Sequence, residues 1–319
     1  MKQNLKFKTV FTFVFASVFM FLACINIFAI DPQQKKSQVN IPIAMALDDG
    51  YTYPTIVSIT SIMENASRDT YYDFYIMHPS NFKTDNKNKI MSLIKKYSRC
   101  KIKFINMEKA YSSAYDKGHI TTPAYYRLSL PDKLPNIDKI LWLDGDTLIF
   151  KDLREMYNLD MRGLYCRGLL DDYPHRLSKF GIKCDKYICS GVMVMNLKDM
   201  RRDRVVQKFN KFIRANNNKL AQHDQTVINY VCRGKIGKLP PRFGMFNYYS
   251  QRNDWKKYCK NGYTQKEMEN AFDNLSIIHC ICKPWNNPKV AFGRHWWDYA
   301  RKTAFYKDIC KKYPASRRK

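Results

Sequence analysis

The stretch that decides the fold reads Lys139-Ile140-Leu141-Trp142-Leu143-Asp144-Gly145-Asp146-Thr147-Leu148-Ile149-Phe150. Its apolar run, residues 139–143, has the length and composition of a buried strand. Residues i and i+2 of a strand point to the same side, so Asp144 and Asp146 can converge on one cation. Carboxylate oxygens suit Mg²⁺ or Mn²⁺, which in turn hold a diphosphate. A charged turn after a strand would look the same, so the surrounding sequence has to decide between the two.

Strand-like and helix-like patterns alternate through the body of the chain. Apolar runs predict strands at residues 41–47, 73–78, 101–106 and 137–143, and helical periods lie between them at 53–65 and 83–98. This alternation predicts an α/β fold with a mainly parallel central sheet flanked by helices. In such sheets ligands gather beyond the carboxyl ends of the strands.

Polar side chains stand where these ligands would gather. Asp48 and Asp49 follow the first strand, and Arg127 lies in a proline-started helix predicted at residues 120–128, from which it could face a diphosphate. Asp224 lies near the start of a helix at residues 223–229, where capping is the simpler explanation. His279 ends a strand at residues 276–279. Beside a pair of aspartates, this histidine becomes a candidate metal ligand.

Taken in order, these residues resemble the family-8 retaining glycosyltransferases, which have a GT-A fold and include bacterial lipooligosaccharide galactosyltransferases and glycogenin. The resemblance implies a catalytic domain at residues 41–293 that binds a nucleotide sugar, with Mn²⁺ or Mg²⁺ on Asp144, Asp146 and His279. It further implies nucleotide contacts from Asp48, Asp49, Arg127 and Lys283, and catalytic or sugar contacts from Asp171, Asp224 and Gln225.

The activity implied by this resemblance is transfer of a hexose from a UDP-sugar to a glycan, a lipid-linked glycan or a glycoprotein. Negative charge builds on the diphosphate as the sugar–phosphate bond breaks, and a divalent ion with Lys283 and Arg127 would stabilise that charge. Gln225 and Asp224 are candidates to support the oxocarbenium ion. The residues leave the identity of a catalytic nucleophile open.

Departures from the family pattern concern the donor site. Gly50 stands where many relatives have a side chain that holds the nucleoside, and Cys189 replaces an asparagine usual before the Ser-Gly pair. The spacing from His279 to Lys283 is two residues shorter than in some bacterial relatives. Donor choice could differ accordingly.

Two other functions fit parts of the sequence. A protein of the same fold that binds nucleotide or sugar without turnover would keep most of these residues. A phosphoryl-transfer hydrolase of the haloacid dehalogenase type also carries Asp-x-Asp after a strand. That class expects threonine or valine at the fifth position of the motif, where this chain has Leu148.

The two ends of the chain point to a membrane. Lysines precede an apolar stretch at residues 10–30, so residues 1–30 are expected to be a signal peptide or a signal anchor, followed by a linker at 31–40. We therefore expect a membrane-anchored or secretory location, and an orientation with the domain in the cytosol also fits. Residues 294–319 contain nine basic and two acidic residues among aromatic rings, which favours contact with a membrane surface.

The net charge of +27 predicts anionic binding partners, which include nucleic acid, an anionic membrane and phosphorylated ligands. The sequence contains no recognised nucleic-acid module, and its basic residues do not gather around a reading element, so we expect no nucleic-acid partner. The ten cysteines are dispersed, which favours buried thiols over a disulfide framework.

Overall fold

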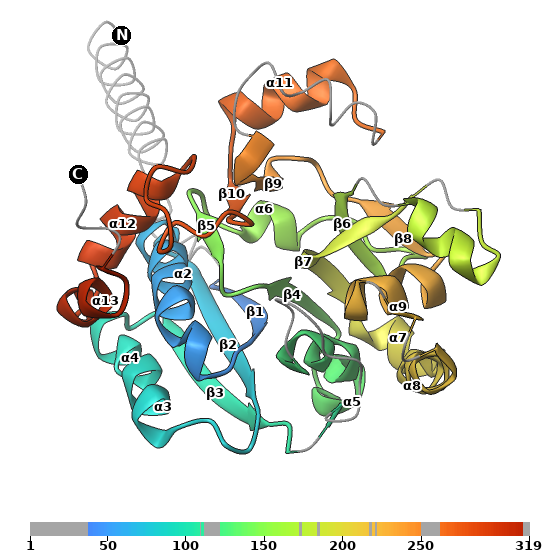
Figure 1. The fold of residues 1–319 in the computed structure, drawn as a ribbon, viewed down its shortest axis with the longest axis horizontal. Helices are drawn as coiled ribbons and strands as arrows, with labels where there is room; N and C mark the ends of the chain where they lie inside the picture. The colour runs from blue at the N-terminus through green and yellow to red at the C-terminus, as the bar shows by residue number, and fades with distance from the viewer. Residues whose placement is uncertain are drawn as a thin grey trace, which may run out of the picture. The chain divides into compact units, whose positions relative to one another are not determined.

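A seven-stranded sheet forms the centre of the fold (Figure 1). The structure is a computed structural model that describes residues 38–314 except 109, 112–121, 172–173, 184–185, 217–218, 221 and 250–261. The expected leader and most of the linker lie outside the described residues, so their assignment stays a prediction. Among the helices that the structure describes, none is both long enough and apolar enough to cross a bilayer.

Every strand of the large sheet is parallel to its neighbours except β7, which runs against both strands beside it. The mainly parallel sheet confirms the predicted α/β class. In spatial order the strands are β3 (Cys100–Asn106), β2 (Thr70–His78), β1 (Val39–Ala46), β4 (Lys139–Leu143), β7 (Ile188–Asn196), β6 (Cys166–Leu170) and β8 (Ile236–Lys238).

A smaller sheet of three strands contains β5 (Thr147–Ile149), β10 (Ile277–His279) and β9 (Phe243–Phe246). Strand β10 lies in the middle, antiparallel to β5 and parallel to β9. Because β4 ends just before Asp144 and β5 begins just after Asp146, the Asp-Gly-Asp turn is where the chain passes from the large sheet to the small one. The turn lies at the carboxyl end of β4, where the sequence predicted a site.

Helices flank the large sheet, with α2, α3, α4, α12 and α13 toward the β1–β3 end and α7, α8 and α9 toward the other end (Figure 1). The helix predicted at 83–98 is divided at Ser92, whose Oγ donates to the Lys89 carbonyl at 2.7 Å and so competes with the helical bonds. The α-helices are α2 (Thr52–Glu64), α3 (Thr84–Met91), α4 (Leu93–Lys96), α5 (Leu130–Lys133), α6 (Arg154–Tyr157), α7 (Leu197–Arg202), α8 (Val205–Asn216), α9 (His223–Val231), α11 (Gln265–Asp273), α12 (Gly293–Arg301) and α13 (Tyr306–Lys312). The 3₁₀ helices are η1 (Asp49–Tyr51), η2 (Thr122–Ser129), η3 (Pro174–Phe180) and η5 (Asn247–Tyr249).

Each face of the large sheet has its own apolar cluster. Ile41 and Ile43 of β1 and Leu141 of β4 belong to the cluster that also contains the buried isoleucines of α2. The neighbouring positions Ala44 and Trp142 belong to the cluster on the other face, which also takes in α9. The two-residue period of the strands produces this division, and it buries both faces of the sheet.

Helix α2 is unusual because its buried face carries a stripe of small polar residues. Ser61 Oγ accepts the Ile149 N–H at 3.0 Å, and Asn65 Nδ2 donates to the Ile149 carbonyl at 3.0 Å. Ser58 Oγ lies 3.0 Å from Thr147 Oγ1, so this stripe follows β5 along its length. Since β5 pairs with β10 on its other side, side chains of α2 take the place of a missing neighbour strand.

The basic and aromatic C-terminal segment folds back into the domain as α12 and α13 up to residue 314. Trp296 and Trp297 are buried, so their rings belong to the core and cannot serve as interfacial side chains. Arg294, Arg301 and Lys302 are exposed. Any membrane contact by this segment would therefore rest on its charges and not on its tryptophans.

Candidate functional site

The Asp-Gly-Asp turn is fixed by contacts within itself and by α2. Thr147 Oγ1 donates to the Asp144 carbonyl at 2.9 Å, and the Thr147 N–H donates to the same oxygen at 3.2 Å. Position 145 requires glycine because a Cβ there would lie 2.4 Å from Thr55 Oγ1 of α2. The turn thus packs directly on the polar stripe of α2, which sets the positions of both aspartates.

Asp144 is held from the side of the large sheet. Its Oδ1 accepts from Arg127 Nη2 at 3.0 Å and from Trp142 Nε1 at 2.9 Å. The Arg127 guanidinium also stacks 4.4 Å from the centre of a Trp142 ring. With Oδ1 bonded twice, Oδ2 is the oxygen that faces His279.

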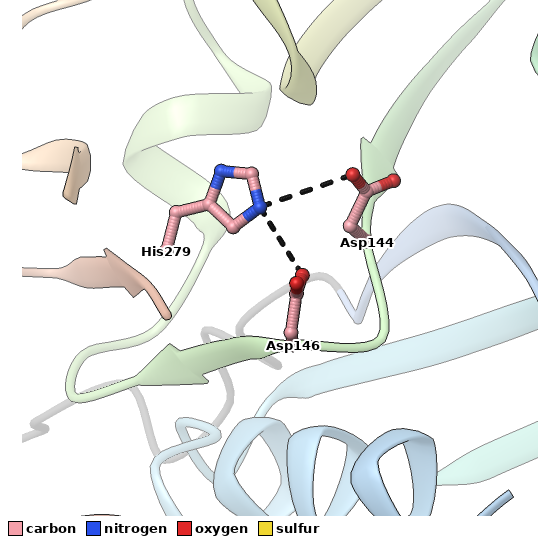
Figure 2. Close-up of side chains that lie close together, drawn as sticks. All are labelled: Asp144, Asp146 and His279. Atoms are coloured by element: carbon pink, nitrogen blue, oxygen red, sulfur yellow. Dashed lines mark ion pairs between the residues drawn. The ribbon is translucent and has the colours of Figure 1, made fainter. Parts of the chain in front are cut away.

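Asp144, Asp146 and His279 converge on one point (Figure 2). His279 Nε2 lies 3.1 Å from Asp146 Oδ1 and 3.9 Å from Asp144 Oδ2, and one ligand atom from each residue falls within 4.8 Å of the others. Apart from the His279 ring, Asp146 Oδ1 is buried without a hydrogen-bond partner among the described residues. An imidazole nitrogen and two carboxylate oxygens, one of them unsatisfied, fit Mn²⁺ or Mg²⁺.

Strong electrostatic coupling links this cluster. Burial opposes ionisation of Asp146, but the charges of Lys283 and His279 outweigh it and hold the pKa of Asp146 well below its usual range. Burial likewise lowers the pKa of His279, yet the Asp146 carboxylate overcomes that effect and raises it to about 10. A cation that binds here at neutral pH must therefore displace a proton from His279.

Lys283 completes the cluster from the loop after β10. Its ammonium contacts Asp146 Oδ2 and donates to the Cys280 carbonyl at 3.2 Å. The loop is fastened by Asn247, whose amide donates to the Cys282 carbonyl at 2.7 Å and accepts the Cys282 N–H at 3.0 Å. The Lys283 side chain remains 27% exposed, so its ammonium can also reach a ligand.

Strand β7 carries the residues behind the cluster. A Cβ on Gly191 would lie 2.2 Å from His279 Cε1 and 2.9 Å from Asp144 Oδ2, so only glycine lets the strand approach both side chains. The group that packs against this glycine is the His279 ring. Burial raises the pKa of the neighbouring Cys189 thiol, which is therefore neutral at pH 7.

Asp171, Asp224 and Gln225 gather beside the start of β7. Gln225 Nε2 donates to Asp171 Oδ2 at 3.0 Å, and Gln225 Oε1 accepts the Ser190 N–H at 3.2 Å. Asp224 Oδ2 lies 3.0 Å from Arg127 Nε, but that N–H donates to the Ala124 carbonyl. Burial raises the pKa of Asp224 to about 6, because the nearby charge of Arg127 offsets the cost of desolvation only in part.

Asp48 and Asp49 support the local backbone at the end of β1. Asp48 Oδ1 accepts the Gly50 N–H at 2.9 Å and caps η1, and a Cβ on Gly50 would lie 3.0 Å from this oxygen. Asp49 Oδ1 accepts from the Lys83 N–H at 3.1 Å and from Asn86 Nδ2 at 2.6 Å. Their contacts to a nucleotide stay a prediction.

Comparison with known proteins decides the family. The sequence profile described as "Glycosyl transferase family 8" matches residues 42–289. The chain belongs to glycosyl transferase family 8. General stress protein A of Bacillus subtilis is 26% identical over 268 residues, which cover 81% of this family 8 chain and 92% of that protein. Lipopolysaccharide 1,2-glucosyltransferase of Escherichia coli is 23% identical over 256 residues, which cover 77% of this chain and 73% of that protein.

A solved structure shares the fold of this family 8 enzyme. The galactosyltransferase LgtC, crystallised in complex with donor and acceptor sugar analogs, superposes with a TM-score of 0.70 at 19% identity. The match covers 83% of this chain and 96% of LgtC. The GT-A fold predicted from the sequence is therefore confirmed.

Two aromatic residues of the family 8 enzyme belong to the site but were absent from the sequence prediction. Trp142 bonds Asp144, and the spacing i, i+2 within one strand could have revealed that both point the same way. Tyr51 lies close to Lys283 and Asp146, and burial, reinforced by the Asp146 charge, raises its pKa. Nothing in the sequence links Tyr51 to residues so distant along the chain.

Proposed function

We propose that this family 8 glycosyltransferase is metal-dependent and retaining, and that it transfers a hexose from a UDP-sugar to a glycan or glycolipid acceptor. The observation that carries the proposal is the convergence of Asp144, Asp146 and His279 beside Lys283. Mn²⁺ or Mg²⁺ held by these three residues would neutralise charge on the leaving diphosphate. The chain supplies the remaining functions through its own side chains.

Lys283 is placed to stabilise the leaving group. The bond between the anomeric carbon and the diphosphate oxygen breaks, and its electron pair stays on that oxygen. The ammonium of this partly exposed side chain offers a fixed positive charge to the oxygen as negative charge develops there. The acceptor hydroxyl attacks from the same face, and its proton passes to the departing phosphate oxygen.

Gln225, Asp171 and Asp224 are proposed to face the transferred sugar. The two hydrogen bonds of Gln225 fix its amide, so Oε1 keeps one orientation. An amide oxygen and nearby carboxylates favour positive charge at the anomeric carbon. Front-face attack within an ion pair then needs no stronger nucleophile.

We also propose that residues 1–30 target or anchor the enzyme at a membrane. The lysines followed by an apolar stretch support this assignment. The exposed basic residues of α12 and α13 would add electrostatic attraction to an anionic surface. The nucleotide sugar would come from a secretory lumen, or from the cytosol if the catalytic domain faces that side of the membrane.

Hydrolysis of a panel of sugar nucleotides by the full-length chain tests the proposal, with Mn²⁺ or with EDTA. We expect one donor to be hydrolysed only with metal, and Asp146→Asn to lower the rate roughly 10²–10³-fold. Asp160→Asn, a change at an exposed aspartate paired with Arg162, is the matched control. Metal-independent turnover, or an unaffected Asp146→Asn variant, would rule out the proposed site.

A further inference from the structure

Cys189 contacts the edge of the His279 ring that points away from the aspartates. Its Sγ lies 3.9 Å from His279 Nδ1, and the Gly191 N–H donates to the same sulfur at 3.5 Å. The side chain is buried on β7. Its thiol therefore contacts the proposed metal cluster through His279.

The two nitrogens of His279 face different partners. Nε2 points at Asp144 and Asp146, and Nδ1 points at Cys189. A neutral imidazole carries one proton, and the partner of one nitrogen decides whether the other can bind a metal. A sulfur that accepts from Nδ1–H leaves the Nε2 lone pair directed at the aspartates.

The His279 ring has little freedom apart from this choice. Gly191 packs against it so closely that a Cβ there would lie 2.8 Å from Nδ1. Phe246 covers another side, with ring centres 5.8 Å apart. Packing thus sets the position of the ring. The contact with Cys189 would then decide which nitrogen carries the proton.

A cysteine beside a histidine can also be a nucleophile activated by a base. That role requires a free imidazole nitrogen to take the thiol proton and a sulfur that reaches the substrate. Here Gly191 N–H and His279 Nδ1 surround the sulfur, and the ring separates it from the point where Asp144 and Asp146 converge. The geometry favours support of the ligand over attack.

We propose that Cys189 is a positioning residue, whose sulfur accepts from His279 Nδ1–H and so presents Nε2 to the divalent ion. This inference rests on the proposed function, since it assumes that His279 is a metal ligand. A sulfur is a weaker hydrogen-bond acceptor than an oxygen, so this enzyme would orient its histidine through a weak hydrogen bond.

Mn²⁺ titration followed by electron paramagnetic resonance tests the inference without any turnover. We expect Cys189→Ala to weaken Mn²⁺ binding about 10–100-fold, as loss of a partner behind a metal-bound histidine does. Cys189→Ser keeps an acceptor and should recover part of the affinity. Cys100→Ala, at a buried cysteine on β3, is the matched control and should bind as the wild type does.

Nitrogen-15 NMR of labelled histidine shows which ring nitrogen carries the proton. Measured on the wild-type chain with Mg²⁺, it needs no folded variant. The proton is expected on Nδ1 of His279. A proton on Nε2, or equal Mn²⁺ affinity in wild type and Cys189→Ala, would overturn the inference. If the wild type bound no Mn²⁺, this inference and the proposed function would both fall. Mn²⁺ binding without turnover of any donor would remove only the proposed function.

Discussion

The two halves of the site use their charges differently. On the large-sheet side, Arg127 is 3% exposed and bonds Asp144 together with the carbonyls of Ala124 and Ser190. On the small-sheet side, Lys283 is partly exposed, and Oδ1 of its partner Asp146 faces only the His279 ring among the described residues. The Arg127 guanidinium is saturated by the protein itself. Lys283 and Asp146 keep capacity for ligands, so substitution of Arg127 should mainly affect stability and substitution of Lys283 mainly turnover.

Arg127→Lys should produce the largest loss of stability. Lysine cannot reproduce contacts to Asp144, Ser190 and Ala124 at once, and the buried Asp224 carboxylate would lose the guanidinium 3.0 Å away. We expect the free energy of unfolding to fall by about 3–5 kcal/mol, measured by urea denaturation. Arg162→Lys, at an exposed arginine, should change it by less than about 0.5 kcal/mol. An Arg127→Lys variant as stable as the wild type would remove the distinction between the two halves.

Lys283→Met should affect turnover more than stability. It removes the positive charge beside Asp146 while keeping much of the side-chain length. Donor hydrolysis is expected to slow roughly 10²–10³-fold, because the charge acts on the leaving group. Steady-state rates with Mn²⁺, combined with the urea midpoint, separate the two effects. A variant that unfolds easily but turns over normally when folded would reverse the comparison.

Asp224 should give the large-sheet half a distinct pH dependence. Its pKa in the folded state, about 6, lies above the ordinary aspartate value of 3.8, so folding favours the protonated form. This contribution to stability is present below pH 4 and is lost as pH rises through 6, with a total of about 3 kcal/mol. Urea denaturation from pH 4 to 7 should show this fall in the wild type but not in Asp224→Asn.

The control for this pH profile is Asp160→Asn. A hydrogen bond from Arg162 lowers the pKa of Asp160 to about 2, so that carboxylate is already ionised throughout the range. Its variant should follow a profile parallel to the wild type. A parallel profile for Asp224→Asn as well would show that Asp224 does not titrate between pH 4 and 7.

Ser61→Ala should have the smallest of these effects. It leaves the buried Ile149 N–H of β5 without its acceptor, which costs about 1–3 kcal/mol of stability. Thermal unfolding compared with Ser98→Ala, at an exposed serine, measures the difference. An unchanged melting temperature would show that α2 does not substitute for a strand beside β5.

The strands and the metal cluster could be predicted because they depend on local patterns. The run before Asp144 has the length and composition of a buried strand, and the strand-end rule brings His279 to the same region from far along the chain. The roles of Asp144, Asp146 and His279 remain predictions, although the structure places them together. Family membership rested on the order of several such motifs and is confirmed.

The features that the sequence did not reveal depend on tertiary contacts and not on local preference. Ser58 and Ser61 resemble ordinary weak helix formers, and only the missing neighbour of β5 gives them a purpose. The contacts of Arg127 to protein acceptors depend on residues that no local pattern connects, and its contact with a diphosphate stays a prediction. The burial of Trp296 likewise depends on how α12 packs, and composition alone suggested a surface.

The most direct test of the account is calorimetric titration of Mn²⁺ into the full-length chain with and without UDP, for the wild type and Asp146→Asn. We expect one Mn²⁺ per wild-type chain, tighter binding in the presence of UDP, and loss of both effects in Asp146→Asn. Equal Mn²⁺ affinity in the two proteins, or UDP binding that EDTA leaves unchanged, would contradict it.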